Sequence, residues 1–162
     1  MLTGTRMRPA VLGLLFCLAV GGGACAEDTV GQARVIDGDT IEIMGAKIRL
    51  EGIDAPERAQ ACSSNGVPWA CGAASSAWLA EFLAGREIAC VEKGRDRYGR
   101  LLATCFVGGE NLNDRIVREG WALDFRRYTH SYVEAEEEAK RKGMGVWRGE
   151  FELPWEWRRQ HH

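Results

Sequence analysis

The sequence predicts an α+β fold, a five-stranded β-barrel with three α-helices, and three observations support this prediction. Residues 29–50 contain three stretches in which apolar and polar residues alternate, as in half-buried strands. Two further strand patterns, at 87–92 and 101–107, flank the polar segment 93–100. Helical spacing of apolar residues at 74–83 separates the third strand from the fourth. Five short strands with a helix after the third are typical of an OB-type barrel.

The first 26 residues are expected to be removed as a secretory signal peptide. Two arginines precede an apolar run at 11–20 that is too short for a membrane span, and small residues at 24–26 supply a cleavage site. A lipoprotein signal with an acylated Cys25 ranks second, because the residues at 22–24 lack the expected aliphatic side chain. We therefore expect a secreted or periplasmic protein, with no membrane association unless Cys25 is lipidated.

The mature chain, residues 27–162, has the length of one domain, with a core at about 30–147 and a tail rich in Trp and Arg at 148–162. Two of the 21 Lys and Arg leave with the signal peptide and none of the 23 Asp and Glu does, so the mature net charge is −4. This charge excludes a broadly basic nucleic-acid-binding protein. Affinity for a polyanion would have to come from local arginines and a bound cation. We expect a monomer with no stable protein partner.

Acidic residues are concentrated in the stretch 35–57, VIDGDTIEIMGAKIRLEGIDAPE. Its alternating isoleucines predict two antiparallel strands joined by a tight turn. A turn centred after Gly45 places Asp37 opposite Asp54, so that these two carboxylates and that of Asp39 meet at the open end of the hairpin.

Carboxylates crowded in this way repel one another unless a cation lies between them. All the candidate ligands are oxygens, which favours calcium or magnesium over zinc or copper. A DGDT sequence alone is more often an ordinary solvated turn. The additional Arg49, Asp54 and Glu57 nearby instead favour a functional site.

Four cysteines remain after the signal peptide is removed, and an exported protein is expected to oxidise them. A hairpin that turns after Arg97 places Cys90 opposite Cys105, at a cross-strand distance that suits a disulfide. The remaining pair is then Cys62–Cys71.

The rest of the chain predicts two more helices and a packed tail. Asn111 or Asn113 caps the first of these helices, and Ser131 with Glu134 forms a capping box for the second, whose Glu-rich face is expected to be solvated. The tail places its tryptophans between arginines, a pattern that also suits stacking on bases. Packing of these tryptophans onto the barrel is favoured, because large aromatic side chains are mostly buried.

Three motifs together resemble the staphylococcal-nuclease-like, or thermonuclease, family: IDGDT at 36–40, RLEGIDAPE at 49–57 and DRYGR at 96–100. They occur in the family's order and at compatible spacing, and the resemblance covers nearly all of the chain from about residue 30 to residue 147. The tail also resembles exported bacterial members. The resemblance implies an SNase-like, calcium-dependent endonuclease that hydrolyses phosphodiester bonds of DNA and RNA with low sequence specificity and leaves 3′-phosphate ends.

The resemblance also implies a metal site. Asp39 and Asp54 are similar to the family's calcium-binding carboxylates, and the backbone carbonyl of Ala55 to its third protein ligand. Glu57 is similar to the family's general base or water-positioning group. Asp37 is expected to be a supporting turn residue. Ala55 replaces the usual threonine, which matters little to a backbone ligand.

Arginines complete the implied site. Arg49 and Arg100 resemble the family's two phosphate-binding arginines, whose planar forks match two oxygens at once. Arg97 and Tyr98 occupy positions that contact a terminal phosphate of the nucleotide in the family. The family's paired tyrosines of the base pocket have no clear match around 123–128, where Tyr128 is the nearest candidate.

Two alternatives remain open on the sequence alone. The first is a catalytically silent OB-fold module that binds an oligonucleotide or a protein partner. Such relatives normally lose some of the acidic or arginine positions, all of which are present here. The second is an envelope protein in which calcium is only structural.

Overall fold

A computed structural model describes residues 28–161. The predicted signal peptide and Cys25 therefore lie outside the described residues. Within residues 28–161, no helix is long and apolar enough to span a membrane.

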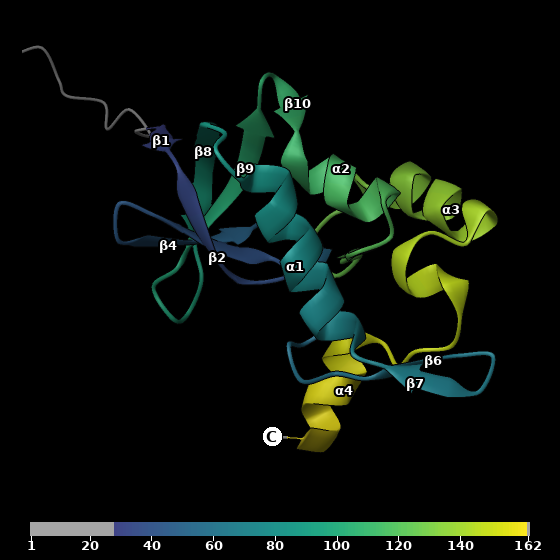
Figure 1. The fold of residues 1–162 in the computed structure, drawn as a ribbon. Helices are drawn as coiled ribbons and strands as arrows, with labels where there is room; N and C mark the ends of the chain where they lie inside the picture. Colours follow the sequence, from purple (N-terminus) through teal and green to yellow (C-terminus); the bar gives the residue numbers. More distant parts are fainter. Residues whose placement is uncertain (1–27, 162) are drawn as a thin grey trace, which may run out of the picture.

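Strands and helices of the described chain are arranged as a β-barrel with helices packed beside it (Figure 1). The strands are β1 (Thr29–Gly31), β2 (Ala33–Asp37), β3 (Thr40–Ile43), β4 (Ala46–Leu50), β5 (Ile53–Asp54), β6 (Cys62–Ser64), β7 (Val67–Trp69), β8 (Ile88–Arg95), β9 (Leu101–Val107), β10 (Glu110–Asn111) and β11 (Leu123–Asp124). The helices are α1 (Cys71–Leu83), α2 (Leu112–Arg118), α3 (Val133–Lys142), the 3₁₀ turn Gly145–Arg148 and α4 (Pro154–His161).

The barrel is the predicted α+β OB-type fold. Its strands follow the order β8-β9-β4-β3-β2, with β4 and β9 parallel and the other pairs antiparallel. The predicted first strand at 29–36 is two strands, because the chain changes partner at Gln32: β1 pairs with β8 and β2 pairs with β3. This change of partner connects the two ends of the sheet and closes it into a barrel.

The β3–β4 hairpin has a different register from the predicted one. Its turn consists of Met44 and Gly45, both with positive φ, and Thr40 consequently pairs with Arg49. The predicted pairing of Asp37 with Asp54 is therefore wrong. The turn is centred one residue before the predicted position. Its two-residue form matches the twist of the strands, although Met44 takes the first position, where Asn or Asp is usual.

Both predicted disulfides are present. Cys90 and Cys105 are direct partners in the β8–β9 ladder, and Cys62 is joined to Cys71 at the start of α1. Cys62 belongs to a short β6–β7 hairpin that the sequence predicted only as a loop. Asn65 and Gly66, both with positive φ, form its turn.

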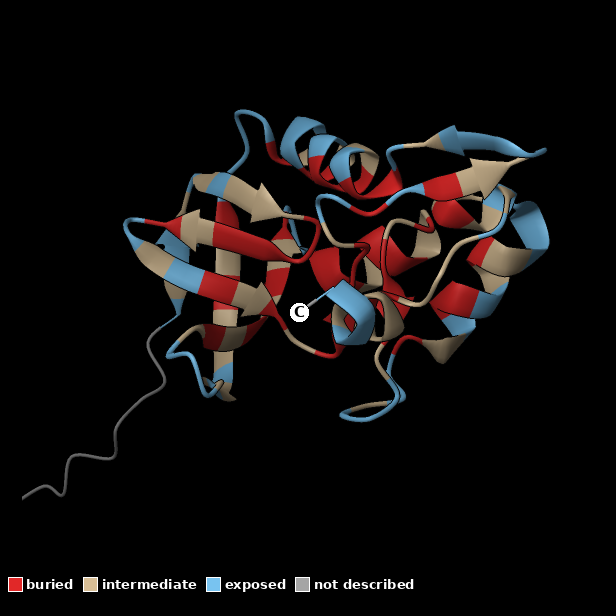
Figure 2. Cartoon of the chain, turned by 90° about the horizontal axis from the view of Figure 1, so that it is seen from below, coloured by how far each residue is buried: buried red, intermediate tan, exposed pale blue. Residues whose placement is uncertain are grey.

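Apolar side chains of the barrel strands, α1 and α2 form the main core, visible as the inward-facing buried segments of Figure 2. The side chain of Asn111 caps α2, as one of the two predicted candidates. The predicted capping box of α3 is wrong, because the helix begins after Tyr132 without a side-chain cap. The expectation of a fully solvated Glu face is also wrong at Glu136, which is buried and accepts hydrogen bonds from Arg126 and Lys140.

A second, smaller apolar cluster lies beside the barrel, and partly buried side chains of the C-terminal tail pack against it. Its buried members include both cysteines of the Cys62–Cys71 disulfide, and Trp147 and Trp155 pack against them. The tail is paired with β6 through two backbone hydrogen bonds between Ser63 and Glu150, each 2.8 Å long. Trp147 and Trp155 therefore pack against apolar side chains, as predicted, but against this second cluster and not against the barrel core. The tail also adds a fourth α-helix to the described part of the chain.

Candidate active-site cleft

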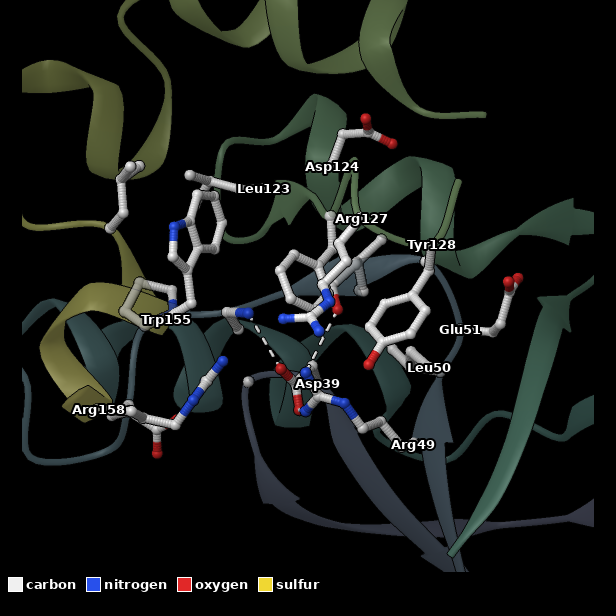
Figure 3. A pocket seen from close by; sticks show the side chains of 18 of the residues that line it. Asp39, Arg49, Leu50, Glu51, Leu123, Asp124, Arg127, Tyr128, Trp155 and Arg158 are labelled. Carbon is white, nitrogen blue, oxygen red and sulfur yellow. Dashed lines mark hydrogen bonds and ion pairs between the residues drawn. The ribbon is translucent and has the colours of Figure 1, made fainter. Parts of the chain in front are cut away.

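The predicted site residues line a single cleft of about 1200 Å³. Its walls come from the β2–β3 turn, from β4 and the segment after it, from the β8–β9 turn, and from α4 (Figure 3). Of the predicted set, this lining includes Asp39, Arg49, Ala55, Glu57, Arg97, Tyr98 and Arg100. Asp54 lies beneath it and is fully buried.

Arg49 joins the two aspartates of the predicted metal site. One guanidinium nitrogen donates to Asp39 Oδ1, and the other donates to Asp54 Oδ1 at 2.7 Å. Burial alone would lower the pKa of Arg49, but attraction to Asp39 and Asp54 outweighs it and raises that pKa. Arg49 is therefore a charged bridge that holds the two buried carboxylates close together.

The turn between β2 and β3 positions Asp39 against helix α1. A Cβ atom on Gly38 would lie 2.4 Å from Ser75 Oγ and 2.7 Å from the Cβ of Ala55, so only glycine permits this approach. Asp37 Oδ1 accepts a hydrogen bond from the backbone N–H of Asp39 at 3.1 Å, which fits its predicted supporting place in the turn. The N–H of Ala55 donates to Asp39 Oδ2 at 3.0 Å. Asp39 is thus fixed from both sides.

Arg158 of α4 is a cleft residue that the sequence analysis did not single out. Its guanidinium donates to Asp54 Oδ2 at 2.7 Å, to Asp54 Oδ1 at 3.1 Å and to Glu57 Oε1 at 2.6 Å. Arg49 and Arg158 lie on either side of Asp39 in Figure 3. The arginines of the tail were the only sequence signal that pointed to this contact.

Glu57 is held by its backbone, which leaves its carboxylate directed into the cleft. The N–H of Glu57 donates to Gln60 Oε1 at 3.1 Å, and its carbonyl accepts from Gln60 N at 2.7 Å. The same buried Gln60 side chain donates to the carbonyl of Glu152 at 2.6 Å. One buried amide therefore fixes both the Glu57 segment and the chain that leads into α4.

Arg100 lines the same cleft as Glu57 and lies in the turn between β8 and β9. Its Nε donates to Asp96 Oδ2 at 2.7 Å, and its Nη1 lies 3.4 Å from Thr40 Oγ1, which in turn donates to Asp39. The guanidinium of Arg97 lies 4.8 Å from the ring centre of the exposed Tyr98. The structure thus brings the five predicted acidic and basic groups together, with Arg97 and Tyr98 at the margin.

Three aromatic side chains, Phe125, Tyr128 and Trp155, line the same cleft and form an aromatic wall. The sequence analysis predicted only Tyr128 as part of it. Phe125 stacks on Trp155 with ring centres 5.4 Å apart and contacts Tyr128 edge-on at 5.1 Å. Phe125 and Trp155 belong to segments 30 residues apart, so no short motif joins them. Tyr128, the predicted candidate, is an exposed member of this wall.

The residues present fit a hard divalent cation in chemical type. Asp39 and Asp54 supply carboxylate oxygens, and three carboxylates share two guanidiniums, which leaves negative charge to be neutralised. Burial, the largest cause, and repulsion from Asp39 raise the pKa of Asp54 against the opposing effect of its arginines. Within residues 28–161 no three Asp, Glu, His or Cys side chains are grouped as metal ligands, so backbone oxygen and water would have to complete the coordination.

The raised pKa of Asp37 is expected to make the stability of the fold depend on pH. Burial, followed by repulsion from Asp39, raises its pKa from 3.8 to about 6. The native state then binds more protons than the unfolded state between these values, so stability falls as pH rises through this window. Asp37→Asn should raise the free energy of unfolding at pH 7 by about 1–3 kcal/mol, with no gain below pH ~3.8.

Urea unfolding at pH 7 and at acid pH, without divalent cations, measures this difference. Asp28→Asn, at an exposed position before β1, is the control and should change neither value. A gain from Asp37→Asn that is the same at both pH values would contradict the prediction.

Comparisons with known proteins agree with this geometry. The model of the family described as "Staphylococcal nuclease homologue" matches residues 47–149. The chain is 42% identical over 154 residues to the succinoglycan biosynthesis protein ExoI of Rhizobium meliloti, covering 91% of this chain and 78% of that protein. It is 33% identical to an uncharacterized endonuclease of Haemophilus influenzae, covering 85% of this chain and 78% of the relative. It is 34% identical to a micrococcal nuclease of Shigella flexneri, covering 78% of each chain. A family match over more than half of the sequence, with relatives of this similarity, shows that the chain belongs to the staphylococcal nuclease homologue family.

Proposed function

We propose that this protein is a calcium-dependent nuclease that hydrolyses phosphodiester bonds of DNA and RNA with little sequence specificity. The single observation that supports it most is the network in which Arg49 joins the buried Asp39 to Asp54, with Glu57 and Arg100 on the same cleft. The nuclease names of several family relatives support the reaction class.

Charge stabilisation is the principal task of the cleft in this proposal. Hydrolysis of a phosphodiester builds negative charge on the phosphate oxygens as water attacks. Arg49 and Arg100 would hold these oxygens with planar, permanently charged forks. Asp39, Asp54 and the carbonyl of Ala55 would hold a calcium ion, which supplies further positive charge at the phosphate.

Glu57 would act on the attacking water. Its side chain is about one-third exposed while its backbone is anchored, so the carboxylate can reach solvent in the cleft without disturbing the fold. A carboxylate at this position would orient the water and accept its proton. Arg97 and Tyr98, on the exposed turn, would contact a terminal phosphate. The aromatic wall that contains Phe125 would stack on a base.

Export is part of the proposal. Two disulfides in the described chain indicate an oxidising compartment. Together with the predicted signal peptide at residues 1–26, they support a secreted or periplasmic location.

The test is digestion of single-stranded DNA and of RNA by the purified protein, with calcium and with excess EGTA. We expect cleavage of both substrates with calcium and its loss with chelator. Equal rates under both conditions would remove the cation from the mechanism. The absence of cleavage under either condition would favour the second candidate, a silent OB-fold binding module. The observation in favour of that module is that both oxygens of Asp54 already accept hydrogen bonds from arginines.

A further inference from the structure

The guanidinium of Arg158 occupies the carboxylates to which a cation would bind. Asp54 accepts three hydrogen bonds from the two arginines, and Arg158 donates two of them. The same guanidinium also engages Glu57 at 2.6 Å. Arg49 donates to Oδ1 of Asp54 and leaves Oδ2 free, whereas Arg158 engages both oxygens. A divalent cation that binds Oδ2 would therefore meet the guanidinium of Arg158 at the same oxygen, and the two positive charges would repel each other strongly.

Helix α4 is attached to the cleft by few contacts. Besides the Arg158 ion pairs, Trp155 stacks on Phe125 and packs against the second apolar cluster. The other side-chain interactions of α4 lie within the tail itself: Arg159 pairs with Glu156, His161 stacks on Trp157, and Gln160 donates to Glu152. Pro154 is the one buried residue of this helix. The helix can therefore detach at the cost of one ion-pair network and the contacts of Trp155 and Pro154.

The chain just before α4 is anchored much more firmly. Glu150 pairs with Ser63 through two backbone hydrogen bonds, and the carbonyl of Glu152 accepts from the buried Gln60. Release of α4 would therefore leave the tail in place up to Glu152. Figure 2 shows the C-terminal helix lying across the junction between the barrel and the helical part of the molecule.

The balance of charge in the cleft favours replacement of the Arg158 guanidinium by a divalent cation. The carboxylates of Asp39, Asp54 and Glu57 face only two guanidiniums, so replacing the single charge of Arg158 with a divalent ion would neutralise the cluster more completely. Without such an ion, Arg158 keeps the buried Asp54 from being unpaired, which would be strongly destabilising.

We propose that Arg158 is a latch: its guanidinium and a divalent cation bind the carboxylates of Asp54 and Glu57 in turn, so that cation binding releases α4 from the cleft. This inference rests on the cation site of the proposed function. It adds a closed state, in which α4 covers the carboxylates, and an open state, in which the ion is bound and the cleft admits substrate. The apparent cation affinity is then lowered by the fraction of protein that is closed.

The test compares three variants by calcium titration calorimetry, without nucleic acid. Arg158→Met removes the competing charge, and Trp155→Ala weakens the attachment of α4 while leaving every charge in place. Arg159→Met is the matched control, since Arg159 is 73% exposed and, among residues 28–161, forms an ion pair only with Glu156. We expect both Arg158→Met and Trp155→Ala to bind calcium about tenfold or more tightly than the wild type, and Arg159→Met to match the wild type.

Hydrogen exchange of residues 154–161 provides the second readout. Calcium should increase the exchange of α4 amides in the wild type, whereas in Arg158→Met exchange should already be fast and should not respond. Unchanged calcium affinity in Arg158→Met, or α4 exchange in the wild type that ignores calcium, would overturn the latch. Absence of calcium binding in every protein would overturn it as well.

The two proposals fail in different ways. A wild type that cleaves DNA with calcium, together with an Arg158→Met variant of unchanged calcium affinity, would leave the nuclease proposal standing without the latch. Conversely, a wild type that releases α4 on calcium binding but cleaves no nucleic acid, together with an Arg158→Met variant that binds calcium more tightly, would support the latch and contradict the nuclease.

Discussion

Replacing Arg49 with alanine is expected to reduce hydrolysis of single-stranded DNA by at least about 10²–10³-fold, the effect of removing one donor that stabilises developing charge. The same change should lower the free energy of unfolding by about 3 kcal/mol without calcium, because two buried carboxylates lose their shared partner. The loss should not be larger, since Asp54 keeps Arg158 and Asp39 keeps the N–H of Ala55. Calcium should restore part of the stability by neutralising the same carboxylates.

Rates under substrate saturation and urea unfolding with and without calcium measure the two effects. Arg34→Ala is the control, because Arg34 is 66% exposed and its one ion pair within the described part of the chain is with Glu42. It should change stability by less than about 1 kcal/mol. Arg49→Lys retains the charge but loses the planar fork that reaches both aspartates. Its rate of hydrolysis and its stability should therefore lie between those of the wild type and those of Arg49→Ala. An Arg49→Ala variant with full activity would refute the assigned phosphate contact.

Glu57→Gln is expected to lower the rate of hydrolysis by about 10²–10⁴-fold while leaving the fold intact. The amide has nearly the shape of the carboxylate but cannot accept the proton of the attacking water. The fold should persist because Gln60 holds the backbone of Glu57, and because Arg158 keeps its ion pair with Asp54 when its contact with Glu57 is weakened. The fall should appear in kcat rather than in KM, as for a group that acts on the reacting atoms.

Glu51→Gln is a matched control in the same cleft. Glu51 also lines the cavity but lies on the far side of Arg49 and Tyr128 from Arg158 (Figure 3). The Glu51→Gln substitution removes one negative charge, as Glu57→Gln does, but leaves the proposed base in place. Its kcat should therefore stay near the wild-type value. If both glutamate variants lose activity equally, the effect would come from the total charge of the cleft and not from the position of Glu57.

Much of the site could be predicted because its parts are close in sequence. Asp39, Arg49, Asp54 and Glu57 lie within 19 residues, on one hairpin and the segment that follows it. They meet even though the predicted hairpin register was wrong, since Arg49 reaches both aspartates from near the end of β4. The arrangement of the site therefore depends less on the register of the β3–β4 hairpin than on the presence of these charged side chains at its open end.

Residue patterns alone predicted the barrel, both disulfides and the acidic and basic motifs, because strand periodicity, turn residues and cross-strand pairs are local properties. Tertiary structure alone decided that Arg158 contacts Asp54, more than a hundred residues earlier, and that Trp155 stacks on Phe125. The physical reason is the path of the tail, which is fixed by Gln60 and by the pairing of Glu150 with Ser63. No short-range pattern encodes that path, because it results from the sum of contacts between distant segments.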